Sequence, residues 1–323
     1  MNKRIGKGKP KLGFRMTKRR KEALAKGYKL NAEGNAVDPK TGVVVLRFDG
    51  YKTNNVDLTP AKPVKKETDA QREVKISKRF RVLKTLASAC VSGQARALIV
   101  SGPAGLSKSY TIEQILQKHD PAEKVWTIVK GYVRATGLYQ LLYQHRFPGQ
   151  VLVFDDADSI FTGSDAEVSI NMLKAVLDTC ERRRVSYHAQ TELYDGSDKI
   201  PETFDFEGTC IFITNYDFDE QIAMDKKLSP HLAALQSRSH YIDLAMKDER
   251  DFLVRIRQVC KEDKMLRQQG LTAAEEKDVL DFLEKNYQRC RELSLRTALK
   301  LGALRKHDKN WRETAEVTCL HNQ

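Results

Sequence analysis

The segment that most restricts what this chain can fold into runs from Gly102 to Ser109, between a short apolar stretch, Ala97 to Val100, and a helical pattern. Between a strand and a helix, glycines let the backbone curl until its N–H groups face a polyphosphate. A lysine at position 108 can then reach the β- and γ-phosphates, and a serine hydroxyl at position 109 can ligate Mg²⁺. The sequence therefore predicts a loop that binds ATP with Mg²⁺ through Gly102, Pro103, Ala104, Gly105, Leu106, Ser107, Lys108, Ser109 and Tyr110.

One position departs from the usual G-x-x-x-x-G-K-[ST] form of such a loop, because Ser107 stands where the glycine before the lysine is expected. A side chain at this place is expected to crowd the phosphate or to strain the backbone. The eight residues also fit an ordinary glycine-rich turn between a strand and a helix. Residues farther along the chain must therefore decide between the two interpretations.

The composition favours a protein without a membrane span. The 323 residues suffice for a sizeable core and for two globular parts with an extension. No apolar run of about eighteen residues occurs, and the basic N-terminus is not followed by an apolar segment, so neither a membrane span nor a secretory signal is expected. The six cysteines are scattered without metal-ligand spacing and are expected to be reduced thiols of a cytoplasmic protein.

The formal net charge of +13 is concentrated near the N-terminus. Residues 1 to 30 contain twelve lysines and arginines against one acid, which gives +11 and leaves +2 for the rest of the chain. We expect this arm to contact nucleic acid phosphates, although a solubilising tail explains the same charge. Strand and turn signals at residues 28 to 48 predict a basic arm with a small β-hairpin module over 1–50, and the polar residues 51–73 are predicted to be a linker.

Strand and helix patterns alternate over residues 74–245. The strand candidates are Leu98–Ser101, Val125–Val129, Val151–Phe154, Thr209–Thr214 and His240–Leu244. They are separated mostly by helical segments, which predicts an α/β domain with a parallel sheet covered by helices. Strand signals then stop, and helical patterns near 247–263, 272–287 and 295–306 predict a small all-α domain over 246–310, followed by a C-terminal tail over 311–323.

Polar residues end two of these strands. Asp155 and Asp156 follow the strand Val151–Phe154, at the carboxyl end where α/β sheets place their ligands. We predict that Asp155 holds Mg²⁺ through water and that Asp156 polarises the attacking water. Asn215, which ends the strand Thr209–Thr214, would orient that water against the γ-phosphate. A helix cap at the acids and a simple turn at the asparagine are the structural alternatives.

The order of these motifs resembles that of one family. A phosphate loop, an acidic pair and an asparagine after a strand are followed by the triplet Ser237-Arg238-Ser239 and by Ser294-Leu295-Arg296 at the start of a helix. Over residues 97 to 306 the chain resembles the AAA+ ATPases. Stretches such as Lys130-Gly131-Tyr132 and Ile200-Pro201 are similar to bacteriophage-encoded members of that family. The resemblance implies a P-loop AAA+ sheet with an all-α lid, ATP hydrolysis, and the host cytoplasm as location for a phage-encoded chain.

The resemblance also implies roles for two arginines. Arg238 would be the arginine finger that stabilises charge on the γ-phosphate in a neighbouring subunit, which implies a homo-oligomeric ring such as a hexamer. Arg296 would be the second sensor, and a surface arginine is the alternative for both positions. The family usually has glutamate where Asp156 stands, and this departure and Ser107 would slow turnover.

The segment from Lys130 to Arg134 lies where AAA+ rings carry their first pore loop. Tyr132 and Val133 resemble the paddle that grips an extended substrate, and the flanking Lys130 and Arg134 suit a phosphate backbone. Anchoring of the tyrosine in the core is the structural alternative. Alternating residues from 185 to 208 predict a β-hairpin before the strand that carries the sensor asparagine.

Three functions are compatible with the sequence. A motor or loader on nucleic acid, in phage DNA replication, recombination or related transactions, is favoured by the basic arm and the Ser-Arg-Ser triplet. A protein remodeller is favoured by Tyr132 and Val133, and residues 28 to 48 would then serve as its adaptor. A weakly hydrolysing, nucleotide-dependent scaffold is favoured by Ser107 and Asp156. We expect the first of these.

Overall fold

The computed structural model describes residues 18–30, 35–39, 44–46, 67–188, 192–224, 226–246 and 248–321. The chain divides into two compact units, Met1–Lys66 and Glu67–Gln323. Residues 1–17 of the expected basic arm and residues 51–66 of the expected linker lie outside the described residues.

The described part of the first unit is a short helix with a three-stranded antiparallel sheet. The helix is α1 (Lys18–Ala25), and the strands β1 (Lys29–Leu30), β2 (Ala36–Val37) and β3 (Val44–Leu46) pair in the order β1-β2-β3. Gly27 adopts a φ of +87°, a conformation that glycine reaches without steric cost, and follows the end of the helix. Ala23 and Ala36 are buried. The lysines whose side chains are described in this unit are exposed: Lys21, Lys26 and Lys29.

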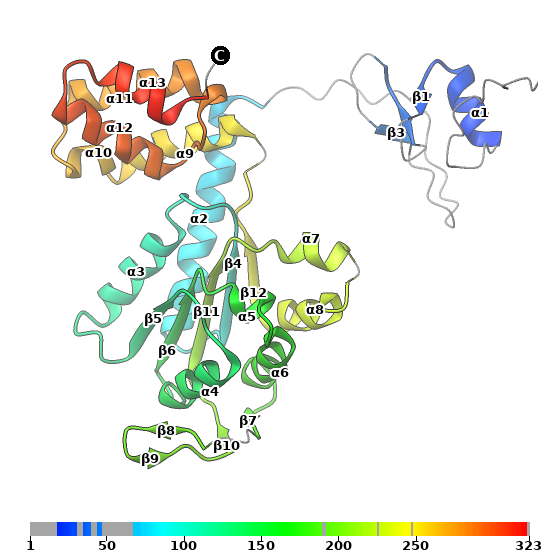
Figure 1. The fold of residues 1–323 in the computed structure, drawn as a ribbon, viewed down its shortest axis with the longest axis vertical. Helices are drawn as coiled ribbons and strands as arrows, with labels where there is room; N and C mark the ends of the chain where they lie inside the picture. Colours follow the sequence, from blue (N-terminus) through cyan, green and yellow to red (C-terminus); the bar gives the residue numbers. More distant parts are fainter. Residues whose placement is uncertain are drawn as a thin grey trace, which may run out of the picture. The chain divides into compact units, whose positions relative to one another are not determined.

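Five parallel strands form the central sheet of the second unit, and Figure 1 shows them side by side. They are β4 (Ala97–Ser101), β5 (Trp126–Lys130), β6 (Val151–Asp155), β11 (Thr209–Thr214) and β12 (His240–Asp243). Their order across the sheet is β12-β4-β11-β6-β5. Every residue of β4, β6 and β11 is buried, which explains why these strands are continuous apolar runs. The predicted fold class, an α/β domain with a parallel sheet covered by helices and an all-α C-terminal part, is confirmed.

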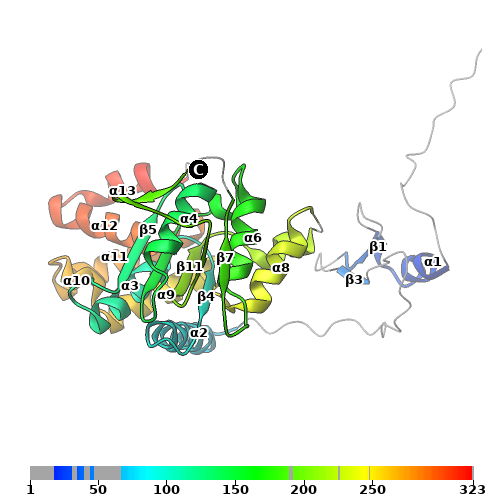
Figure 2. The same cartoon turned by 90° about the horizontal axis from the view of Figure 1, so that it is seen from below.

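Helices cover both faces of this sheet (Figure 2). On one face, α2 (Asp69–Val91) and α3 (Lys108–His119) pack against the alternate residues Val100, Val153 and Ile213. The opposite face carries Phe154 and Phe212, whose stacked rings lie 5.1 Å apart. The helices on that face are α4 (Ala135–Gln144), α5 (Ser159–Thr162), α6 (Ala166–Val176), α7 (Phe218–Ala223) and α8 (Ser229–Arg238).

Apolar residues at helical spacing, from Phe80 to Val91, predict a helix from Ser77 to Ser92, and helix α2 starts earlier than this pattern. A capping box between Thr68 and Gln71 begins the helix at Asp69. The added turns are mostly polar, and Arg72 forms ion pairs with Asp248 and Asp251 at the start of α9 (Glu249–Glu262). Because these turns are held by caps and charges, apolar spacing did not reveal them.

The segment predicted as a β-hairpin contains two antiparallel pairs. β7 (Arg184–Ser186) pairs with β10 (Thr203–Asp205), and β8 (Tyr194–Asp195) pairs with β9 (Asp198–Lys199). Phe204 and Phe206 are buried and fasten the base of the hairpin to the core. Residues 189–191 of this segment lie outside the described residues.

The C-terminal part of the second unit is all-α and has its own apolar core. Its helices are α9 (Glu249–Glu262), α10 (Met265–Gln268), α11 (Ala273–Asn286), the 3₁₀ turn η1 (Tyr287–Arg289), α12 (Leu295–His307) and α13 (Trp311–Cys319). The segment expected as a C-terminal tail therefore contains α13, whose Trp311, Ala315 and Cys319 are buried. Among the described residues, no helix is both long and apolar enough to span a bilayer.

Candidate nucleotide-binding site

A cavity of about 360 Å³ lies where the phosphate loop, the carboxyl ends of β6 and β11, and the C-terminal helices meet. Its lining residues are Ala104, Gly105, Leu106, Ser107, Lys108, Ser109, Tyr110, Asp156, Asn215, Val259, Asp263, Met265, Gln268, Gln269, Leu295, Arg296 and Leu299. Seven residues predicted to contact ATP line this cavity together with Asp156, Asn215 and Arg296. Gly102 and Pro103 do not line it, but their carbonyl oxygens accept hydrogen bonds from the Lys108 ammonium.

Lys108 is buried at the floor of the loop and is 5% exposed. Its ammonium also donates to the Thr214 carbonyl at 3.1 Å and to Asn215 Oδ1 at 2.8 Å. Burial lowers the pKa of Lys108 to about 8, while three nearby aspartates act to raise it. A phosphate group beside this ammonium would favour its charged form.

Ser107 adopts the left-handed conformation, with φ 71° and ψ 23°. This conformation costs a residue with a Cβ atom on the order of 1–2 kcal/mol, so the strain expected from the missing glycine is present. The hydroxyl of Ser107 accepts a hydrogen bond of 2.8 Å from Nη2 of Arg255 on α9. This contact joins segments far apart in the sequence, so no local pattern predicts it.

Gly105 lets the loop approach the start of α12. A Cβ atom at this position, which has a φ of +73°, would lie 2.5 Å from Cβ of Ser294. The N–H of Leu295 donates to the Gly105 carbonyl at 2.9 Å, and Ser294 caps the helix. This close contact brings Arg296, in the first turn of α12, to the cavity.

The oxygen atoms expected to hold Mg²⁺ lie together. Ser109 Oγ donates to Asp155 Oδ1 at 2.7 Å, and Asp155 is 4% exposed. A hydroxyl and a carboxylate are hard oxygen donors of the kind that Mg²⁺ accepts alongside phosphate oxygens and water. No group of three His, Cys, Asp or Glu residues in the described part of the chain forms a separate metal site. The donors therefore fit a magnesium ion that arrives with a nucleotide.

Lys130, predicted to contact a polymer, also points to this place. β5 and β6 are paired so that Lys130 lies opposite Asp155, and its Nζ is 3.3 Å from Asp155 Oδ2. The sequence placed these two residues in different sites. Their contact depends on the register of two strands, which no local pattern specifies.

Asn215 links the acidic pair to the phosphate loop. Its Nδ2 donates to Asp156 Oδ1 at 3.0 Å, and its Oδ1 accepts from Lys108. Asp156 has a φ of 54°, in the left-handed region that aspartate tolerates better than most residues. Asp158, which the sequence analysis did not select, accepts a hydrogen bond from the Thr214 hydroxyl, and burial raises the pKa of Asp158. In the sequence, the signal for Asp158 is an acidic residue two positions after the acidic pair.

Arg238 lies at the end of α8 and is not among the residues that line the cavity. Its Nη1 donates to the Ala234 carbonyl at 2.9 Å, and its Nε is 4.0 Å from Asp178 Oδ2. The side chain is one-third exposed. The structure thus separates this arginine from the cavity of its own chain.

The loop between β5 and α4 presents one aromatic side chain to solvent. Tyr132 is 66% exposed and follows Gly131, which has a φ of +94°. Arg134 is also exposed. Val133, expected beside Tyr132 on the polymer-contacting face, is instead 7% exposed and packs in the core, and its N–H donates to Ser159 Oγ at 2.9 Å. Burial of this aliphatic side chain is favourable because it removes apolar surface from water.

Comparison with known proteins gave one relative in sequence and several similar structures. No family model matches the sequence. The chain is 35% identical over 272 residues, 84% of this chain and 79% of the relative, to an uncharacterized 36.7 kDa protein of the nrdC-mobD intergenic region of Enterobacteria phage T4. The RuvB Holliday junction branch migration motor of Thermotoga maritima is 14% identical with a TM-score of 0.42, covering 76% of this chain and 68% of its own. NtrX from Brucella abortus, solved with ATP, is 13% identical with a TM-score of 0.44, covering 72% and 53%.

Proposed function

This chain belongs to the same protein family as the 36.7 kDa phage T4 protein, and from that premise we propose that it is a P-loop ATPase of the AAA+ type. The observation that carries the proposal is the cavity lined by the phosphate loop, Asp156, Asn215 and Arg296. In phosphoryl transfer the protein mainly positions cations and the attacking water, and it contributes little covalent chemistry. The cavity contains a candidate for each of these parts.

The phosphate loop would bind the nucleotide through its N–H groups and the Lys108 ammonium. Ser109 and Asp155 would hold Mg²⁺, which when bound neutralises charge on the phosphate oxygens. Asp156 would polarise the attacking water. Asn215 would orient it, because the amide already bridges Asp156 and the lysine at hydrogen-bond distance.

Arg238 is proposed to complete the site of a neighbouring copy. It lies outside the cavity of its own chain and is one-third exposed, so its guanidinium is accessible to a partner. An arginine finger supplied in trans stabilises charge on the γ-phosphate in the transition state. The proposal therefore includes a homo-oligomer, arranged as a ring, in which each copy is active only beside another.

Nucleic acid is the proposed polymer. The first 30 residues carry a charge of +11, and the exposed Tyr132 and Arg134 combine an aromatic ring with a cation. Basic segments track a phosphate backbone, and aromatic rings stack on bases. A polypeptide is the second candidate, because the exposed tyrosine alone would grip an extended peptide as well.

The deciding experiment is the ATPase rate with single-stranded DNA, duplex DNA, RNA and an unfolded polypeptide, each titrated separately. We expect stimulation by a nucleic acid. Deletion of residues 1–27 should weaken DNA binding and flatten its salt dependence, while basal turnover stays nearly intact. Stimulation by the polypeptide alone would instead support the protein remodeller.

A further inference from the structure

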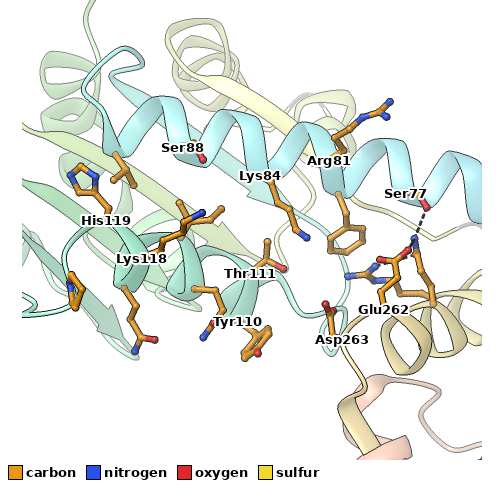
Figure 3. Close-up of a pocket in the computed structure, with 18 residues that line it drawn as sticks. Ser77, Arg81, Lys84, Ser88, Tyr110, Thr111, Lys118, His119, Glu262 and Asp263 are labelled. Atoms are coloured by element: carbon orange, nitrogen blue, oxygen red, sulfur yellow. Dashed lines mark hydrogen bonds between the residues drawn. The ribbon is translucent and has the colours of Figure 1, made fainter. Parts of the chain in front are cut away.

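Arg255 lines a groove of about 1410 Å³ that lies beside the phosphate loop, between α2, α3 and α9. Figure 3 shows its walls, with Ser77, Arg81, Lys84 and Ser88 on α2, Tyr110, Thr111, Lys118 and His119 on α3, and Glu262 and Asp263 at the end of α9. Although it borders this groove, Arg255 is only 4% exposed. Its charge is therefore held almost entirely within protein.

The guanidinium of Arg255 contacts three parts of the second unit. Nη2 donates to Ser107 Oγ in the phosphate loop at 2.8 Å, and Nη1 donates to Gln258 Oε1 on α9 at 3.1 Å. The central carbon lies 3.5 Å from the centroid of the Phe80 ring on α2, a cation–π contact. One side chain thus joins the loop to α2 and α9.

Gln258 fixes the direction of this guanidinium. Its Nε2 donates to Ser77 Oγ on α2, which Figure 3 marks with a dashed line, and to Glu262 Oε1 at 3.1 Å. With the amide nitrogen engaged by both partners, the amide oxygen is left to accept from Arg255. The arginine is therefore oriented toward Ser107 before any ligand arrives.

What Arg255 lacks among the described residues is a direct ion pair. It forms no ion pair with a residue that the structure describes, and its Nε has no hydrogen-bond partner among them. Burial lowers the pKa of Arg255 to about 10, while the nearby Asp263 and Glu262 act to raise it. A buried cation is costly unless an anion compensates it. The groove has no excess of negative charge, because its lining contains the basic residues Arg81, Lys84, Lys118 and His119 together with the acids Glu262 and Asp263.

We propose that Arg255 is a positioning residue for the nucleotide, which holds Ser107 so that the loop presents its N–H groups to the phosphates, and that those phosphates add the negative charge that no direct ion pair gives this arginine. The inference rests on the proposed binding of ATP at this loop. It explains the serine in place of glycine, since glycine adopts the left-handed conformation more easily but offers Arg255 no acceptor. Through this contact, α9 and the phosphate loop bind the nucleotide as one unit.

The test compares the affinities of full-length variants for ATP and for adenosine, which has no phosphate. Arg255→Met keeps an apolar stem over Phe80 and should weaken ATP binding about tenfold, the effect of losing one buried charged hydrogen bond, with adenosine affinity unchanged. Arg255→Lys should recover part of the loss. Arg257→Met is the matched control, because this arginine of α9 pairs with Asp69 and Glu284 rather than with the loop.

Two substitutions of the serine separate strain from hydrogen bonding. Ser107→Ala removes the acceptor and keeps the strain, whereas Ser107→Gly removes both. Each should weaken ATP binding, and neither should add to the effect of Arg255→Met, because both partners act through one contact. Should Arg255→Met fail to fold, the loss of ATP affinity in Ser107→Ala and in Arg255→Lys decides the proposal.

Equal ATP affinity in wild type, Arg255→Met and Ser107→Ala would overturn the inference while leaving ATP binding intact. Tighter ATP binding by Ser107→Gly, with an effect that adds to that of Arg255→Met, would also overturn the inference. The serine would then be only a strained substitute for glycine. A parallel loss of adenosine affinity would indicate a structural role and contradict the proposed one. A wild-type protein that binds no ATP would remove the proposed function together with this inference.

Discussion

Lys130 places a cation beside the carboxylate that is proposed to hold Mg²⁺, and its removal should raise the apparent affinity for Mg²⁺. Its Nζ lies 3.3 Å from Asp155 Oδ2, but the lysine side chain is 63% exposed whereas that of the aspartate is 6% exposed. Because the ammonium remains mostly in water, the pair contributes at most about 1 kcal/mol. A competing interaction of that size weakens the apparent binding of another cation about fivefold. We therefore expect Lys130→Met to need less Mg²⁺ for half-saturation, by a factor of up to about five.

The assay is a Mg²⁺ titration at fixed ATP concentration and low ionic strength, followed by the fluorescence of a labelled nucleotide. Lys124→Met is the control, because this exposed lysine precedes the opposite end of β5. It should leave the midpoint at the wild-type value. An unchanged or higher midpoint for Lys130→Met would refute the view that the lysine and Mg²⁺ compete for Asp155.

Two further substitutions test the C-terminal core and the subunit interface. Trp311→Ala should lower the free energy of unfolding by about 3–5 kcal/mol, measured by urea denaturation, because this side chain is buried in the helical core against Phe282; a loss below about 1 kcal/mol would show that α13 is not part of that core. Arg238→Ala should keep ATP binding but lose turnover on the order of a thousandfold. Full activity of a strictly monomeric protein would contradict the proposed finger.

The strands were predictable because their environment leaves a local signature. β4, β6 and β11 are buried on both faces and are therefore continuous apolar runs. The start of α2 and the whole of α13 have weaker signatures. Polar turns held by a capping box and by Arg72 extend α2, and α13 has nine residues with three buried positions. Both elements are stabilised by tertiary contacts, which the spacing of apolar residues does not reveal.

Part of the candidate site was predictable for a similar reason. Parallel strands bring their carboxyl ends to one edge, so Asp155, Asp156 and Asn215 were expected to meet near the loop. The partners of Lys130 and Ser107 were not predictable in this way. The first depends on the register between β5 and β6, and the second on how α9 docks against the loop, and both are contacts between segments far apart in the sequence.

The central claim is that the loop around Lys108 binds ATP for hydrolysis. The direct measurement is the affinity for ATP with Mg²⁺, together with the rate of phosphate release, for the wild type and for Lys108→Ala, with thermal melting to verify folding. The wild type should bind ATP saturably and release phosphate, and the folded variant should lose both, because it lacks the buried ammonium at the cavity floor. A wild type without ATP affinity, with or without polymer, or a Lys108→Ala variant that binds equally well would contradict the claim.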